Sequence, residues 1–406
     1  MNLEWRQVVA ERPPTNPTNP ADPSYDFSHL DAVVRSAESR GLNVVFTVYS
    51  APDWAEDRRP AGSDAPAGSW KPNPRDLGDF AQALSTRYSG QYAGLPRVGF
   101  YEVWNEPNLT RYLAPQWSGR KLVAAERYRR MLNAFYAGIR AGRGGGKVIA
   151  GATAPYGDDP GGARSRPLRF LRGLFCLADR QKLRLAGCPK RAARAHFDIL
   201  SHHPINTSGG PHTSAIHPDD ASTPDLKFVK KTLRGAERRH SALGQRRHPL
   251  WATEFWWQSN PPDRFHGVPL KIQAERYAET LYLLWKQGAS VALMLQLRDA
   301  PYSPNNSDVS FQAGLYFVGG EPKPSLSYVR FPFVADAAKN DRVVLWAKAP
   351  AAGRLVIERK RKQGWARVKS AQVHRGGIFA TRVRLHGRQR LRARVAGRTS
   401  AAAQVK

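Results

Sequence analysis

Short apolar segments alternate with longer amphipathic segments over most of this chain. The apolar segments are rich in β-branched and aromatic residues, which favours strands. The segment 43–49 is apolar throughout, as strands buried on both faces of a parallel sheet are. The predicted strands cover residues 3–10, 43–49, 98–104, 147–153, 197–201, 249–254 and 291–297.

The amphipathic segments place their apolar residues at helical spacing. The first of them carries Leu30, Val33, Val34 and Ala37 at i, i+3, i+4 and i+7 after Ser28, a residue type that caps helices. The predicted helices cover residues 28–41, 77–88, 121–141, 168–183, 226–243, 272–286 and 324–330.

Strands that alternate with helices form a parallel sheet, and long polar loops after the strands are typical of a (β/α)8 TIM barrel. Seven strand–helix units are present where such a barrel has eight. After residue 333 the pattern changes to short alternating segments separated by glycine, at 342–347, 354–359, 365–368, 378–385 and 390–395. The sequence therefore predicts an α/β TIM-barrel domain over residues 1–333 and a small all-β sandwich domain over residues 334–406.

Two of the predicted strands end in a carboxylate. Glu106 follows the strand 98–104 and precedes Pro107, which has no N–H to continue a sheet. Glu254 ends the strand 249–254 and is followed by Trp256 and Trp257. The carboxyl ends of barrel strands meet at one face, so the two carboxylates should lie close together. Hydrolysis of a glycosidic bond requires one protonated and one ionised carboxyl group, and aromatic residues around them are typical of a sugar-binding site.

Four motifs resemble those of glycoside hydrolase clan A, more narrowly its cellulase-family and β-xylosidase/α-iduronidase-like members. They are Trp-Asn-Glu-Pro at 104–107, Thr-Glu-Phe-Trp at 253–256, Pro-Asp-Trp-Ala at 52–55 and His-Pro at 203–204. The resemblance covers about residues 3–334 and implies that Glu106 is the acid/base and Glu254 the nucleophile. It also implies that Asn105 holds the sugar 2-hydroxyl and that His203 lies near the sugar.

In that clan the acid/base ends strand four and the nucleophile ends strand seven. The strands of this chain then correspond to strands two to eight. The resemblance therefore implies that strand one is missing, by truncation or a start assigned too late, and that any signal peptide lay in the missing part. The residues after Met1 contain no apolar run of the signal-peptide kind.

The chain also departs from the family pattern. Ile205 stands where many relatives have a tyrosine after His-Pro, so the usual phenol partner of the nucleophile is not in that position. The last predicted strand ends in Gln296, Leu297 and Arg298, where many relatives have a tryptophan. Arg6 is the only candidate for the polar residue that many relatives carry on an early strand. These departures bear on the substrate class rather than on the reaction class.

Aromatic and amide side chains complete the predicted substrate site. We expect Trp54, Trp256 and Gln296 to bind substrate together with Asn105 and His203. Core packing is the alternative for each tryptophan, Trp104 included. Strand alternation puts Trp256 and Trp257 on opposite sides, so only one of them should face the cleft.

The chain is strongly basic, with 63 Lys and Arg against 33 Asp and Glu and a formal net charge of +30. Residues 334–406 contain 19 Lys and Arg against 3 Asp and Glu, so more than half of the net positive charge lies in the predicted sandwich. No nucleic-acid reading motif accompanies this charge, which argues against a specific nucleic-acid partner. Weak adhesion to anionic glycans, cell wall or DNA is the expected by-product. No apolar run is long enough to span a membrane.

The spacing of the cysteines and histidines bears on disulfide and metal sites. Cys176 and Cys188 would close a small disulfide loop if the protein is exported, and two buried thiols are the alternative. Several histidines and aspartates cluster in one predicted loop, but their spacing fits no zinc signature, so we expect no metal and no cofactor. The cluster comprises His202, His203, His212, His217, Asp219 and Asp220.

The sequence thus predicts a retaining β-glycoside hydrolase acting on an oligo- or polysaccharide. We expect a monomer, secreted or associated with the cell wall. The alternatives are a catalytically inactive carbohydrate-binding protein and a basic protein that adheres to cell wall or nucleic acid.

Overall fold

A computed structural model of the chain describes residues 1–177, 194–305, 310–337 and 341–405. It divides into two compact units. Unit 1 comprises Met1–Ser208, Thr213–Glu254 and Ala289–Val291, and unit 2 comprises Gly209–His212, Phe255–Gly288 and Ala292–Lys406.

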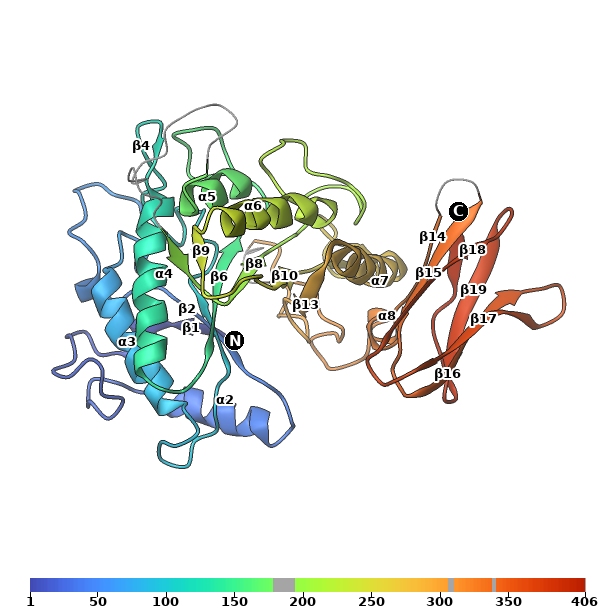
Figure 1. The fold of residues 1–406 in the computed structure, drawn as a ribbon, viewed down its shortest axis with the longest axis horizontal. Coiled ribbons are helices and arrows are strands. Elements are labelled where there is room, and N and C mark those ends of the chain that lie inside the picture. Colours follow the sequence, from blue (N-terminus) through green and yellow to red (C-terminus); the bar gives the residue numbers. More distant parts are fainter. Residues whose placement is uncertain (178–193, 306–309, 338–340, 406) are drawn as a thin grey trace. The chain divides into compact units, whose positions relative to one another are not determined.

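Most of unit 1 is built around a curled, seven-stranded parallel sheet whose strands are neighbours in the order in which the chain makes them; the last residue of β10 and the second half of β13 are assigned to unit 2. Helices follow the strands and lie outside the sheet (Figure 1). This is TIM-barrel architecture, and the predicted fold class is confirmed. The strands are β1 (Asn2–Glu4), β2 (Val45–Tyr49), β3 (Phe100–Val103), β6 (Lys147–Thr153), β8 (Ile199–His202), β10 (Leu250–Phe255) and β13 (Ala289–Met294).

The helices of unit 1 bury the apolar stripes seen in the sequence. Asn73 caps α3 by accepting the backbone N–H of Arg75, and Pro74 occupies the first helical position. Helices α3 and α4 lie side by side (Figure 1), and a Cβ at Gly138 would come within 2.0 Å of the Gly78 carbonyl oxygen. Glycine is therefore required at this contact. The helices are α2 (Ser28–Glu38), α3 (Pro74–Arg87), α4 (Ala124–Ala141), α5 (Pro167–Leu174) and α6 (Leu226–Arg238).

The side chains inside the sheet form an apolar layer and then a polar one. The apolar layer contains Val45, Phe100 and Ile199, which belong to one buried cluster with Ile149 and Trp251. Two residues further along their strands come Thr47, Glu102 and Ser201, on the same face because strand side chains alternate. The polar layer therefore lies nearer the carboxyl ends of the strands, where barrel enzymes carry their active sites.

Two predicted elements are shorter than expected. The strand predicted over residues 3–10 ends at Glu4, and Trp5–Val8 form one helical turn (α1). The buried Trp5 ring stacks on Phe80 at 5.4 Å, so tertiary packing overrides the local strand preference. The helix predicted over residues 168–183 ends at Leu174, and Cys176 adopts a left-handed φ of 50°. Residues 178–183 and Cys188 lie outside the described residues, so the Cys176–Cys188 disulfide stays a prediction.

Unit 2 contains α7 (Leu270–Gln287), α8 (Ser325–Arg330) and two antiparallel sheets. One sheet has the order β14-β15-β18, and the other has the order β17-β16-β19-β20, with β21 also paired to β19. Their inner faces share one apolar core, so the predicted all-β sandwich is confirmed. The domain boundary at residue 334 stays a prediction. The strands are β14 (Phe333–Ala337), β15 (Arg342–Lys348), β16 (Gly353–Lys360), β17 (Trp365–Val373), β18 (Ile378–Arg384), β19 (Gln389–Val395), β20 (Arg398–Thr399) and β21 (Ala403–Val405).

The two tryptophans of the sandwich have different environments. Trp346 is only 2% exposed and packs against Tyr282 and Trp285 of α7 at ring distances of 5.8 and 5.9 Å. Trp365 is half-buried on the edge strand β17. Packing therefore accounts for Trp346 but leaves part of Trp365 exposed. No helix in the described part of the chain is long and apolar enough to cross a membrane.

These environments predict unequal costs of truncation. Trp346→Ala should lower the free energy of unfolding by about 3–5 kcal/mol, because it leaves a cavity between β15 and α7. Trp365→Ala should cost about 1 kcal/mol or less. Urea unfolding followed by circular dichroism measures both, and equal losses would contradict the assignment of Trp346 to packing.

Candidate functional site

The turn that follows β3 has an unusual backbone. Trp104 and Glu106 both have left-handed φ angles, of 66° and 38°. Their N–H groups donate to the carbonyls of Val48 at 2.8 Å and Ala152 at 3.0 Å, on the two neighbouring strands. Left-handed conformations of bulky residues are strained and persist where the surroundings impose them, often at functional sites. The two neighbouring strands thus fix the position of the Glu106 backbone.

Three side chains from three strand ends converge beside this turn. His203 Nδ1 lies 3.1 Å from Glu106 Oε1 and 3.7 Å from Glu254 Oε2. One oxygen from each glutamate and the imidazole nitrogen all lie within 4.8 Å of one another. The Glu106 and Glu254 side chains are 14% and 19% exposed, whereas that of His203 is 1% exposed. The two carboxyl groups are therefore accessible, and the imidazole is buried behind them.

The charges in this cluster depend on one another. Burial opposes protonation of His203, but the charge of Glu254 and the hydrogen bond to Glu106 outweigh it and raise its pKa to about 9. Burial raises the pKa of Glu254 to about 7; the His203 cation opposes this rise, whereas Glu106 and Glu102 add to it. An ordinary glutamate ionises at a lower pH than this. Near neutrality the cluster therefore still binds protons, on His203 and in part on Glu254.

Glu102 was not found by sequence reasoning. It is 2% exposed in the polar layer, and it accepts hydrogen bonds from Thr47 Oγ1 at 2.9 Å and Ser201 Oγ at 2.7 Å. Its charge acts on both His203 and Glu254. The only signal in the sequence is a carboxylate within an apolar strand.

Two tyrosines near the glutamates were also missed. Burial and the charges of Glu106 and Glu254 raise the pKa of Tyr112 to about 12, so its hydroxyl remains a hydrogen-bond donor at all ordinary pH values. Tyr112 is hydrogen-bonded to the side chain of Asn105, and its ring lies 5.9 Å from that of Tyr49. The family pattern puts a tyrosine at position 205, where this chain has isoleucine, so sequence reasoning predicted no phenol beside Glu254. Tyr112 instead follows β3 and Tyr49 ends β2.

Asn105, the predicted ligand of the sugar 2-hydroxyl, lies in the turn between Trp104 and Glu106. It is 6% exposed, and its Oδ1 is buried without a hydrogen-bond partner among the described residues. Trp104 is fully buried and donates its indole N–H to the Tyr112 carbonyl at 2.6 Å, which is the packing alternative.

Trp54 belongs to unit 1 and is held by the N-terminal segment. Its indole N–H donates to the Ala10 carbonyl at 3.2 Å, and its ring meets Trp5 edge-on at 5.7 Å. These contacts explain its position by packing. A role for Trp54 in substrate binding stays a prediction.

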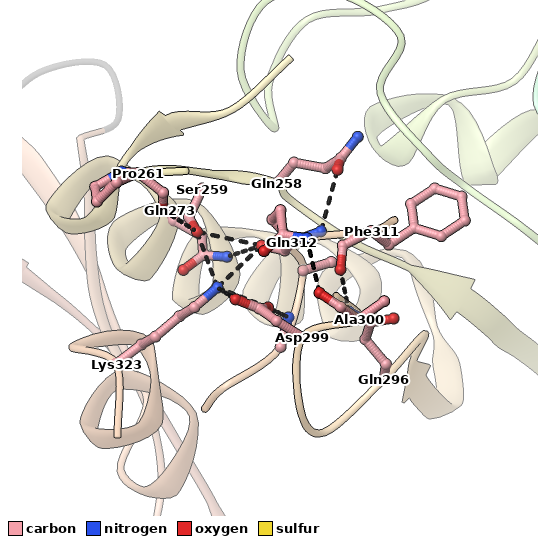
Figure 2. A network of polar contacts seen from close by, with 12 residues as sticks. Gln258, Ser259, Pro261, Gln273, Gln296, Asp299, Ala300, Phe311, Gln312 and Lys323 are labelled. Atoms are coloured by element: carbon pink, nitrogen blue, oxygen red, sulfur yellow. Dashed lines mark hydrogen bonds and ion pairs between the residues drawn. The ribbon is translucent and has the colours of Figure 1, made fainter. Parts of the chain in front are cut away.

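Trp256 and Gln296 belong to unit 2. Trp257 is buried and donates its indole N–H to Thr280 at 2.9 Å, whereas Trp256 is half-buried with its ring 5.4 Å from Phe311. Gln296 Nε2 donates to the Phe311 carbonyl at 2.6 Å, as Figure 2 shows. One tryptophan thus points inward and the other remains accessible. Substrate binding by Trp256 and Gln296 stays a prediction.

A buried ion pair organises the loops of unit 2 (Figure 2). Lys323 Nζ lies 2.7 Å from Asp299 Oδ2 and donates to Ser259 Oγ at 2.8 Å and the Gln312 carbonyl at 3.0 Å. The Lys323 and Asp299 side chains are 0% and 1% exposed. Asp299 Oδ1 also accepts the backbone N–H of Gly314 at 2.8 Å. One cation therefore fixes three loop segments.

The histidine and aspartate cluster weighed for a metal has other partners. Burial lowers the pKa of His202 to about 4, and its ring nitrogens contact Thr153 Oγ1 and the Ala221 carbonyl. Asp219 pairs with Arg172 and Asp220 with Arg166, each at 2.7 Å. The side chains in the described ranges with the spacing to hold a cation are Glu106, His203 and Glu254.

Comparisons with known proteins support the fold. No protein-family model matches the sequence, and no curated protein matches it. A family 39 glycoside hydrolase from the gut symbiont Bacteroides cellulosilyticus superposes with a TM-score of 0.56 at 17% identity, covering 95% of this chain and 74% of that one. A glucosidase from Croceicoccus marinus superposes with a TM-score of 0.51 at 13% identity, covering 95% and 87%. These likenesses show a shared fold, the TIM barrel.

The buried pair of unit 2 gives a stability prediction. Lys323→Met should lower the free energy of unfolding by about 3–5 kcal/mol, because Asp299 is left charged and unpaired. Lys286→Met is the matched control: its partner Asp336 lies 3.0 Å away at an exposed site, and the cost should stay below about 1 kcal/mol.

Urea unfolding of these two variants, of Asp299→Leu and of the double variant Lys323→Met/Asp299→Leu measures the coupling. The double variant should lose less than the sum of its single replacements. A Lys323→Met variant as stable as Lys286→Met would show that the network contributes nothing.

Proposed function

We propose that the protein is a retaining glycoside hydrolase that cleaves β-glycosidic bonds in an oligo- or polysaccharide. The observation that carries the proposal is the approach of Glu106 and Glu254, with an oxygen of each inside the 4.8 Å cluster. Carboxyl groups about 5–5.5 Å apart suit double displacement, whereas inverting enzymes separate them by about 6.5–9.5 Å to admit water. The TIM-barrel glycosidase fold supports the same reaction class.

In the proposed reaction, Glu106 protonates the leaving oxygen while Glu254 attacks the anomeric carbon. The C–O bond to the leaving group breaks, and a glycosyl ester forms on Glu254. Glu106, now ionised, then takes a proton from water, which attacks the anomeric carbon; the bond from that carbon to the Glu254 oxygen breaks, and the sugar leaves with Glu254 regenerated. No other group is consumed in either step.

His203 has a positioning role in this mechanism. Its buried imidazolium donates to Glu106 and faces Glu254, so it offsets the repulsion between the two carboxylates. It also favours the ionised form of Glu254, which is the nucleophilic form. Asn105, with its unpartnered Oδ1, and Tyr112 would bind sugar hydroxyls beside the reacting carbon.

We further propose that the protein works outside the cell or at the cell wall, where such polysaccharides occur. The net charge of +30 favours retention at anionic surfaces.

Turnover of a glycoside distinguishes the proposed enzyme from an inactive carbohydrate-binding protein.

Trapping the covalent intermediate tests the proposal. A panel of activated 2-deoxy-2-fluoro β-glycosides should add one glycosyl group to the protein, seen by intact mass and localised by peptide mapping to Glu254. Glu254→Gln should form no adduct. Glu106→Gln should still form it with a dinitrophenyl leaving group, which needs no acid, but should release it slowly.

The same panel should be run with and without a chelator, because Glu106, His203 and Glu254 have the donors of a cation site. An adduct on another residue would reassign the nucleophile. Absence of both adduct and turnover on all glycosides, polysaccharides included, would support the binding-protein alternative.

The charges around Glu254 predict the pH dependence. The reaction needs ionised Glu254, so kcat/KM should fall about tenfold per unit below pH 7, the value to which its pKa is raised. His203→Gln removes a cation that lowers this pKa, so the acid limb should move to higher pH. Glu102→Gln removes a charge that raises it, so the limb should move to lower pH.

Profiles of kcat/KM with an aryl glycoside measure these shifts. Opposite displacements in the two variants require an electrostatic cause, since a loss of folding would lower the rate without moving the limb in opposite directions. Displacement in the same direction would contradict the proposed roles of His203 and Glu102.

A further inference from the structure

The outer face of the sheet formed by β16, β17, β19 and β20 is strongly cationic. Along β16 and β19 the buried side chains are Leu355, Ile357, Leu391, Ala393 and Val395. Alternation therefore turns the intervening residues to the other face. That outer face carries Arg354, Glu358 and Lys360 on β16 and Arg392 and Arg394 on β19.

The register of the sheet gathers these residues. Glu358 pairs in register with Arg392 of β19 on one side and with Arg367 of β17 on the other. Lys360 is opposite Trp365 across the same β16–β17 ladder. Directly opposed side chains on one face lie about 5 Å apart, so the residues form one continuous surface.

The positive charge on this face is only partly compensated. Glu358 accepts from Arg392 Nε at 2.8 Å and lies 3.5 Å from Arg394 Nη1, so one carboxylate serves two guanidinium groups. Arg354, Arg367 and Arg394 are exposed. The face therefore carries more positive groups than its single carboxylate can compensate.

An aromatic ring lies within the charged surface. The Arg392 guanidinium is 4.0 Å from the centroid of the Trp365 ring, and Lys360 Nζ is 5.6 Å from it. The ring is half-buried, unlike that of Trp346, and it lies on the edge strand of the sheet. The surface thus combines an apolar ring with donors that match carboxylates bidentately.

We propose that this face binds a carboxylated polysaccharide, a polyuronate chain laid across β17, β16 and β19. The arginines bind uronate carboxylates, and the ring of Trp365 contacts the apolar face of a pyranose. The choice of a glycan over a nucleic acid rests on the proposed glycosidase function. The face would hold the enzyme on an acidic polymer while unit 1 acts on a glycosidic bond.

Binding of the full chain to polygalacturonate, measured by affinity electrophoresis and by calorimetry at several salt concentrations, tests the proposal. Methyl-esterified polygalacturonate is the neutral reference with the same backbone. The triple variant Arg367→Gln/Arg392→Gln/Arg394→Gln should bind polygalacturonate at least tenfold more weakly. The matched control Arg238→Gln/Arg239→Gln/Arg246→Gln removes three exposed charges from unit 1 and should change affinity less than threefold. Trp365→Ala should weaken binding without altering its salt dependence.

Several outcomes would overturn the proposal. Equal losses of affinity in the two triple variants would show that binding depends on net charge and not on this face. Retention by the methyl ester, or no binding to polygalacturonate, would exclude the carboxylates as ligands. Tighter binding of double-stranded DNA, weakened by the same sheet variant, would assign the face to nucleic acid. Binding without glycosidase activity would leave this proposal standing and remove the proposed function instead, so the two are separable.

Discussion

The site depends on one buried imidazolium between two carboxyl groups. Two carboxylates within a few ångströms repel each other strongly where water is scarce, and a third, Glu102, lies in the layer beneath them. His203 supplies the opposing charge, and its fixed position determines which oxygens approach. The hydroxyl groups of Thr47 and Ser201 donate hydrogen bonds to Glu102 and so satisfy the third carboxylate inside the barrel. Without this set of partners the converging strand ends would bring together groups that the fold could not keep ionised.

The backbone supports the same arrangement. Trp104 and Glu106 take left-handed conformations that cost free energy, and hydrogen bonds to the flanking strands β2 and β6 impose them. The barrel is therefore the means by which three chain segments, distant in sequence, set both the position and the charge of two side chains. In unit 2 the buried Lys323–Asp299 pair holds loops in a comparable way, because several loop segments bind the same ammonium group.

The sequence alone predicted the barrel, the sandwich and the two carboxylate-bearing strand ends, because each leaves a local signal. Apolar runs mark the strands, and Pro107 marks the end of one. Sequence reasoning did not find Glu102, Tyr49 and Tyr112. Their place in the site comes from the register between strands and from the return of a loop, which no local pattern encodes. Trp54 illustrates the opposite difficulty. An aromatic residue in a predicted loop can be a candidate for substrate binding, and yet its contacts, here with Trp5, can be packing contacts. The strand predicted beyond Glu4 failed for the same reason, since burial of Trp5 decided its conformation.

Two adjacent histidines at the end of β8 respond to acid in opposite ways. In the unfolded chain both would titrate near 6.5, but in the folded protein the pKa of His202 is lowered to about 4 and that of His203 is raised to about 9. His203 adds stability that is complete below pH 6.5 and lost as the pH rises to about 9. His202 adds stability that is complete above pH 6.5 and lost as the pH falls toward 4. The combined contribution of the two histidines is therefore greatest near pH 6.5, so neighbouring residues of one strand end respond to acid and to base from opposite sides of that value.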